Sequence, residues 1–196
     1  MRNLLLATTS AALMAFGAAT AQADGWTLSA EASKVAFGSI KKDTVGEAHH
    51  FSGLSGSVDE NGEATIEIDV TTLETWIDIR NERMLEHVFK AVKFPNVVIT
   101  TQIDMDDVKD LKPGESTTVT AEALLKFVDR EIELDTDLFV LAVSDKKVLV
   151  TTDELIMVQT EELGIDSGVD KLMELASLPG ITRVTPVALR LMFEKE

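Results

Sequence analysis

Most of the chain alternates between apolar and polar residues with a period of two. In the stretch ATIEIDV, Ala64, Ile66, Ile68 and Val70 share one side, and polar residues separate them. The same alternation recurs in NVVITTQIDM (96–105), TTVTAEALLKF (117–127), EIELDTDLFV (131–140) and TPVALRLMFE (185–194). Successive side chains of a strand point to opposite faces, so this pattern is typical of half-buried antiparallel strands. The chain is therefore expected to be all-β with short helices.

Turn signals separate the predicted strands. Asn61-Gly62 is a strong hairpin signal, and Pro113-Gly114 suits a type II turn. Many short antiparallel strands with regular turns predict a sandwich or a closed barrel. A barrel of about eight strands is just wide enough to be filled by side chains or to enclose one small ligand. Small residues at predicted inward positions favour a cavity: Thr101, Ala121, Ala123 and Thr136.

Two stretches break the alternation and predict short helices. In DIRNERMLEHVFKAVKFPNV (78–97), the apolar residues Met84, Leu85, Val88 and Phe89 recur at helical spacings. We expect an amphipathic turn of helix there, lying across a barrel mouth or edge. The second stretch predicts a helix capped by Ser167 and running to about Leu178, before Pro179-Gly180 ends it.

The first 23 residues have the layout of a secretory signal peptide. Arg2 supplies a positive start, an apolar run follows, and the small-x-small sequence AQA ends at Ala23. The apolar run is too short for a bilayer span of about 20 residues. We therefore expect cleavage after Ala23, a periplasmic protein without stable membrane insertion, and one domain over residues 24–196.

Composition excludes several classes of function. The chain has no cysteine, which excludes disulfides, thiolate metal sites and a cysteine nucleophile. Eighteen basic against 34 acidic residues give a net charge of −16. Nucleic acids and anionic lipid headgroups are recognised by clustered Lys and Arg, so neither is an expected partner.

Groups able to perform catalysis are few. The chain contains no tyrosine and three histidines, His49, His50 and His87, without the spacing of a metal-binding motif. Ser55 lies between glycines, but the sequence around it departs from a nucleophile elbow. We expect no catalytic residue and no metal. The alternatives are a metal-dependent hydrolase that uses the three histidines with nearby glutamates, and a ligand-free structural or stress-related interaction module.

Three segments together resemble the YceI-like, polyisoprenoid-binding periplasmic proteins. They are WTLSAEASKVAFGSIKK (26–42), the stretch from VGEAHHFSG to FPNVVIT (45–100), and TPVALRLMFE at the end of the chain. The resemblance implies an antiparallel lipocalin-like barrel that holds a long isoprenoid, a quinone tail or a related amphiphile in an internal channel. It also implies binding without catalysis, and pairing as a homodimer.

The sequence departs from the family pattern in the helical segment and in a later strand. The family's Arg-Asp pair is here Arg80-Asn81, and its His-Leu pair is Met84-Leu85. A later strand that often begins with glycine in the family reads AEALLKFVDRE. These departures concern the polar end of the implied channel.

The sequence thus predicts a periplasmic carrier of an apolar small molecule, with no cofactor besides a bound polyisoprenoid or quinone-like lipid. Each buried methylene contributes about 0.8 kcal/mol, so a prenyl tail could supply most of the affinity. Arg80, Arg83 and His87 are the predicted headgroup contacts. The predicted channel residues are Val35, Phe37, Ile66, Ile68, Trp76, Val97, Ile99, Leu125, Phe127 and Leu189.

Overall fold

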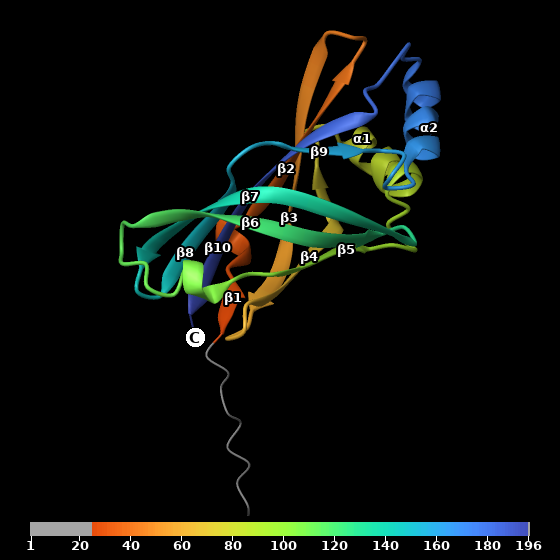
Figure 1. Cartoon of the computed structure of the whole chain (residues 1–196). Helices are drawn as coiled ribbons and strands as arrows, with labels where there is room; N and C mark the ends of the chain where they lie inside the picture. The colour runs from red at the N-terminus through yellow and green to blue at the C-terminus, as the bar shows by residue number, and fades with distance from the viewer. Residues whose placement is uncertain (1–24, 196) are drawn as a thin grey trace, which may run out of the picture.

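A closed ring of antiparallel strands forms the body of the protein, whose computed structural model describes residues 25–195 (Figure 1). The order around the ring is β10-β2-β3-β4-β5-β6-β7-β8, and β8 pairs with β10 to close it. The strands are β2 (Lys34–Lys41), β3 (Val45–Val58), β4 (Glu63–Glu74), β5 (Asn96–Gln102), β6 (Ser116–Phe127), β7 (Arg130–Ser144), β8 (Lys147–Thr152) and β10 (Val184–Lys195). The predicted eight-stranded, lipocalin-like antiparallel barrel is confirmed. The predicted signal peptide over residues 1–23 lies outside the described residues.

Two short strands extend the ring on either side of β10. β1 (Trp26–Leu28) pairs with the end of β10, whereas β2 pairs with its middle, and a 3₁₀ turn at Ala30–Ala32 separates these two strands. On the other side, β9 (Ile156–Gln159) pairs with the start of β10 and β8 with its end. β10 therefore has two neighbouring strands in succession on each side, β2 and β1 on one side and β9 and β8 on the other.

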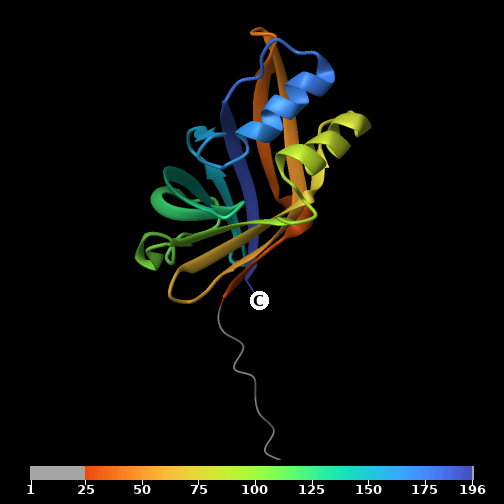
Figure 2. The same cartoon turned by 90° about the vertical axis from the view of Figure 1, so that its right-hand side faces the viewer.

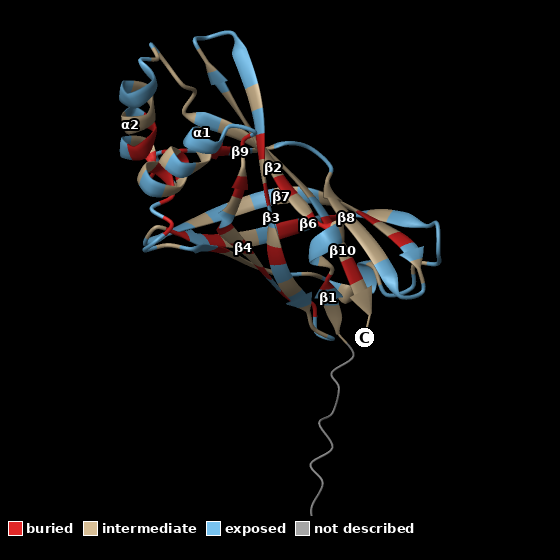
Figure 3. Ribbon diagram, turned by 180° about the vertical axis from the view of Figure 1, so that it is seen from behind, coloured by how far each residue is buried: buried red, intermediate tan, exposed pale blue. Residues whose placement is uncertain are grey.

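The alternating pattern places the apolar rows inside the ring. On β4, Ala64, Ile66, Ile68 and Val70 are all buried, while the residues between them are more exposed. Figure 3 shows the same alternation of buried and exposed segments along the strands. Burial of these rows supplies most of the driving force for closing the sheet.

A bulge interrupts β3 between Phe51 and Gly53. β2 pairs with this strand from Val45 to Phe51, whereas β4 pairs with it on both sides of the bulge. A Cβ on Gly53 would lie 2.5 Å from Cγ2 of Thr72, and the Gly53 amide donates a 2.8 Å hydrogen bond to the Thr72 hydroxyl. The absence of a side chain at Gly53 therefore lets β3 and β4 approach at the bulge.

Two helical segments lie side by side at one end of the ring (Figure 2). α1 (Asp78–Arg83) continues into a π-helical turn at Met84–Val88, and α2 (Asp166–Ala176) packs against that turn. Gly168 makes the close packing feasible, because a Cβ there would lie 2.3 Å from the His87 carbonyl oxygen. No helix among residues 25–195 is long and apolar enough to cross a membrane.

The boundaries of α2 differ from those predicted. The helix begins at Asp166 with Ile165 at the cap position and no side-chain cap, so Ser167 lies inside the first turn. It ends at Ala176 because Ser177 adopts a left-handed conformation (φ 50°). The Leu178 amide then donates to the Met173 carbonyl, which is a common way to close a helix.

Candidate ligand-binding cavity

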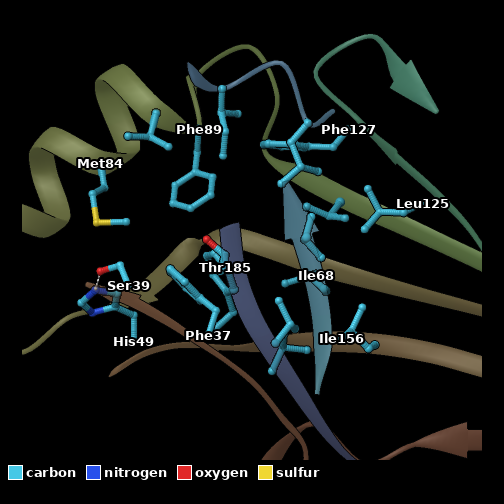
Figure 4. A pocket seen from close by; sticks show the side chains of 18 of the residues that line it. Phe37, Ser39, His49, Ile68, Met84, Phe89, Leu125, Phe127, Ile156 and Thr185 are labelled. Atoms are coloured by element: carbon cyan, nitrogen blue, oxygen red, sulfur yellow. Dashed lines mark hydrogen bonds between the residues drawn. The ribbon is translucent and has the colours of Figure 1, made fainter. Parts of the chain in front are cut away.

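A cavity of about 510 Å³ lies between the inner face of the ring and the two helices. Figure 4 shows part of its lining, from the strands and from the helical segment that contains Met84. Ligand sites typically measure about 300–1,000 Å³, so the space suits one small molecule. The four small residues predicted to leave room all line it, namely Thr101, Ala121, Ala123 and Thr136. The interior is thus hollow.

Phenylalanines join the wall of the cavity to its helical cover. The rings of Phe37 and Phe51 stack with centroids 5.3 Å apart, and Phe89 meets Phe51 edge-on at 5.4 Å. Phe89 follows the π-helical turn and also approaches Phe127, at 6.2 Å. Such aromatic contacts add to the burial energy and fix the position of the cover.

The cavity wall includes all the predicted channel residues except Trp76. The structure brings together Val35, Phe37, Ile66, Ile68, Val97, Ile99, Leu125, Phe127 and Leu189. Five strands supply them, β2, β4, β5, β6 and β10, and all but β2 show clear period-two alternation in the sequence. That these side chains contact a ligand stays a prediction.

Trp76 lies outside the cavity, contrary to its predicted place. Its side chain is 76% exposed and its ring lies 5.7 Å from that of His50, on the outer surface. The chain leaves β4 just before it, and Thr75 takes the inward position instead. The fully buried Thr75 hydroxyl donates to Oδ1 of Asn81, which turns the backbone so that Trp76 adopts φ 65°.

The cavity becomes polar towards the β2–β3 hairpin. On β2 the inward row runs from Phe37 to Ser39, and on β3 it runs from Phe51 to His49 and Glu47. Cross-strand pairing sets Phe37 opposite His49 and Ser39 opposite Glu47. The same two strands therefore build an apolar wall at one level and a polar tier at the next. We call Ser39, Lys41, Glu47, His49 and Arg80 the polar tier.

Ionic contacts centre on Glu47. Its Oε1 accepts a 2.8 Å hydrogen bond from Lys41 Nζ and another from Arg80 Nη1, while Arg80 Nη2 donates to the Thr75 carbonyl. Burial acts to raise the pKa of Glu47, but the bonds from Lys41 and Arg80 outweigh it and leave the pKa below its usual value. Glu47 is thus ionised at neutral pH and compensates one of the two positive charges.

His49 is buried and neutral. Only 3% of it is exposed, and its Nε2 lies 3.3 Å from the Ser39 hydroxyl (Figure 4). Burial, and then the positive charge of Arg80, lower the pKa of His49 to about 4. Its Nδ1 and the Nε of Arg80 are buried and have no hydrogen-bond partner among residues 25–195.

Two of the three predicted headgroup contacts lie at the cavity in the structure. Arg80 and Arg83 line the cavity, and His87 does not. His87 faces away from it, with Nε2 3.8 Å from a carboxylate oxygen of its neighbour Glu86. The departure at Asn81 has a structural reason, since its Nδ2 donates to Oε1 of Glu74 at 3.3 Å, which an aspartate could not do, while its Oδ1 accepts from Thr75.

Four polar wall residues escaped the sequence analysis, although a signal for them existed. Val35 and Phe37 were predicted to face inward, and continuing the same alternation gives Ser39 and Lys41. The hairpin then returns the inward row through Glu47 and His49. Polar residues at inward positions of a strand interrupt the hydrophobic pattern. The pattern alone therefore does not show that the inward-facing row of β2 continues to the hairpin tip.

The three histidines lie apart. His49 faces the cavity, His50 packs against Trp76 on the outside, and His87 belongs to the helical cover. Within the part of the chain that the structure describes, no three His, Asp or Glu side chains gather in a way that could hold a metal ion. The arrangement can shelter an apolar chain and offer hydrogen bonds to a small polar group.

Comparison with known proteins agrees with this geometry. The YceI-like domain matches residues 26–175. A solved polyisoprenoid-binding domain from Saccharophagus degradans, implicated in plant cell wall breakdown, is 32% identical with a TM-score of 0.85, covering 87% of this chain and 98% of its own. No curated protein matches the chain.

Two more distant structures share the fold. BcnA of Burkholderia cenocepacia is 14% identical with a TM-score of 0.65, over 84% of this chain and 98% of its own. A mutant of the CJ YCEI protein is 12% identical with a TM-score of 0.53, over 76% of this chain and 84% of its own. The domain match covers most of the chain, and the Saccharophagus structure matches nearly its whole length. The chain therefore belongs to the YceI-like family.

Proposed function

We propose that this protein is a periplasmic carrier that holds a long apolar amphiphile, such as a polyisoprenoid or an isoprenoid quinone, inside its barrel. The observation that supports the proposal is the cavity of about 510 Å³, whose wall away from the polar tier consists mostly of aliphatic and phenylalanine side chains. The polyisoprenoid binding of the Saccharophagus degradans domain supports the same class of ligand.

Burial of the tail supplies the affinity. At about 0.8 kcal/mol for each methylene, roughly ten buried carbons would provide about 8 kcal/mol, which corresponds to a dissociation constant near 1 μM. No metal or cofactor is needed for this binding. Arg80 and Arg83 remain candidates to contact the headgroup, because both lie in the cavity wall.

The compartment and the assembly belong to the same proposal. The signal-peptide layout of residues 1–23 supports export, and a lipid tail that crosses an aqueous compartment needs to be shielded from water. Pairing as a homodimer is expected from the family resemblance, and sedimentation of the exported protein tests it.

Extraction of the protein from its native host tests the carrier function. The exported protein is purified without detergent, extracted with organic solvent, and the extract is analysed by mass spectrometry. We expect one dominant isoprenoid lipid in stoichiometric amount. The control is the Ala121→Phe variant, in which the added ring occupies the cavity and should leave the extract empty. Repeated recovery of lipid-free wild-type protein would contradict the proposal.

A further inference from the structure

Two buried polar atoms without a partner lie at the same end of the cavity. They are Nδ1 of His49 and Nε of Arg80, and neither has a hydrogen-bond partner among the described residues. Both residues line the cavity, and both belong to the polar tier. Buried polar groups in folded proteins are nearly always hydrogen-bonded, so two exceptions at one end of an apolar cavity indicate a place where a ligand supplies the partner.

The chemistry of these atoms restricts what the ligand can offer. The Nε of Arg80 is only a donor, so the ligand must carry an acceptor. The Nδ1 of His49 is either a donor or an acceptor, depending on whether the Ser39 hydroxyl donates to Nε2 or accepts from it. A hydroxyl satisfies both atoms in either tautomer, and a carbonyl oxygen does so when Nδ1 carries the proton.

Phosphate fits this end poorly. Arginine usually recognises phosphate with the paired donors of its fork, but here Nη1 of Arg80 is bound to Glu47 and Nη2 to the Thr75 carbonyl. Lys41 Nζ is likewise bound to Glu47, so both cations of the polar tier already have protein acceptors. A buried phosphate would also lose its hydration without gaining enough donors in return.

We propose that Ser39, His49 and Arg80 form a headgroup subsite for an uncharged oxygen group, a hydroxyl or a carbonyl, and that it discriminates against phosphate. This inference rests on the proposed carrier function. The subsite orients the ligand, with its polar end beneath α1 and its tail running past Phe51 towards Leu125 and Phe127, where the wall is apolar.

Three probes of one chain length test the subsite: an isoprenoid alcohol, its monophosphate and the corresponding hydrocarbon. Affinities are measured by competition against a fluorescent fatty ligand, using the full exported protein. One hydrogen bond to a buried group is typically worth a factor of roughly three to ten, so the alcohol should bind the wild type that much more tightly than the hydrocarbon. The monophosphate should bind more weakly than the alcohol.

His49→Phe is the informative variant and His50→Phe is its matched control. The first substitution keeps an aromatic ring against Phe37, which His49 meets at 5.2 Å, but removes the nitrogen. It should abolish the preference for the alcohol and leave hydrocarbon affinity within about twofold. The second removes an identical side chain from the outer surface, where His50 faces Trp76, and should change neither affinity.

A second measurement uses only the wild-type protein, so it does not depend on whether a variant folds. In ¹⁵N-labelled wild-type protein, the Nδ1 resonance of His49 should shift with the alcohol and stay unchanged with the hydrocarbon. The inference is wrong if the monophosphate binds most tightly, or if all three probes bind equally and the resonance never shifts; the carrier function survives both results. If none of the probes binds, the carrier function itself fails.

Discussion

The two ends of the cavity are built by the same pair of strands yet have opposite character. Around Val35 and Phe51 the wall is apolar and shaped by aliphatic and phenylalanine side chains. Two to four residues further along each strand, Ser39, His49 and Glu47 belong to the polar tier. The apolar chamber offers non-directional burial, which sets affinity, whereas the polar tier offers fixed hydrogen bonds, which set orientation and selectivity.

The polar tier should make stability depend on pH. The pKa of His49 falls from an ordinary 6.5 to about 4 in the folded protein. Between these values the unfolded chain binds a proton that the folded protein does not, so the free energy of unfolding decreases as the pH is lowered. The total loss is up to about 3 kcal/mol, at about 1.36 kcal/mol per pKa unit.

Urea unfolding between pH 7 and 4 measures this loss. The His49→Phe variant should lose much of the pH dependence. The His50→Phe variant should retain most of it, because His50 is far less buried, although its pKa is lowered in the same direction by partial burial. Parallel curves for wild type and His49→Phe would show that the buried imidazole does not control the acid side of stability.

The apolar chamber should be sensitive to volume. Ala121 is 1% exposed and lines the cavity, so Ala121→Phe places a ring where the ligand tail would lie. Displacing three to four methylenes at about 0.8 kcal/mol each predicts a loss of affinity of roughly a hundredfold. Competition binding with the isoprenoid alcohol measures it.

Glu122→Phe is the matched control for the filled chamber. Glu122 follows Ala121 on β6 and its side chain is exposed on the outer face of the ring. We expect its affinity for the alcohol to stay within about twofold of wild type, since an exposed side chain contributes little to a distant site. Equal losses in the two variants would mean that the tail does not occupy the chamber.

The two arginines at the cavity end should differ in their effect on stability. Arg80→Met leaves Lys41 as the charged donor to Glu47 and removes the arginine donor of the buried Thr75 carbonyl, and should lower the free energy of unfolding by about 2 kcal/mol. Arg83→Met loses only a long, exposed bond to the Leu175 carbonyl, and should cost less than about 0.5 kcal/mol. Chemical denaturation compares them, and equal losses would refute a special role for Arg80.

The smallest predicted effect concerns Trp76, which lies outside both regions. Asparagine tolerates a left-handed backbone better than tryptophan, so Trp76→Asn should relieve strain at φ 65° while losing the contact with the His50 ring. We expect a stability change within about 1 kcal/mol and an unchanged affinity for the alcohol. A large loss of affinity for the alcohol would show that Trp76 contributes to ligand binding.

Much of the fold was predictable because a strand that is buried on one face has apolar residues at every second position. The rows containing Ile66 and Ile68, Leu125 and Phe127, or Leu189 were identified in this way, and they meet around the cavity. The interruption of β1 and β2 was not predictable from pattern. It depends on pairing with β10 and β3, which are far away in the sequence.

The polar end of the site was harder to predict, for two physical reasons. His49 and Glu47 occupy inward positions where a hydrophobic pattern predicts apolar residues, and only the closing of the ring makes those positions buried. Trp76 was misplaced because the even-numbered buried row of β4 ends at Val70, after which Leu73 and Thr75 are buried instead. The hydrogen bonds between Thr75 and Asn81 redirect the chain there, and they form only in the folded protein.

A crystal structure of the exported protein with the isoprenoid alcohol would test the central claim most directly. The account predicts continuous density for one chain inside the ring, with the hydroxyl beside His49 and Arg80 and the tail extending past Phe51 towards Phe127. Density on the outer surface only, an empty interior at saturating ligand, or a hydroxyl placed at the opposite end of the cavity would contradict it.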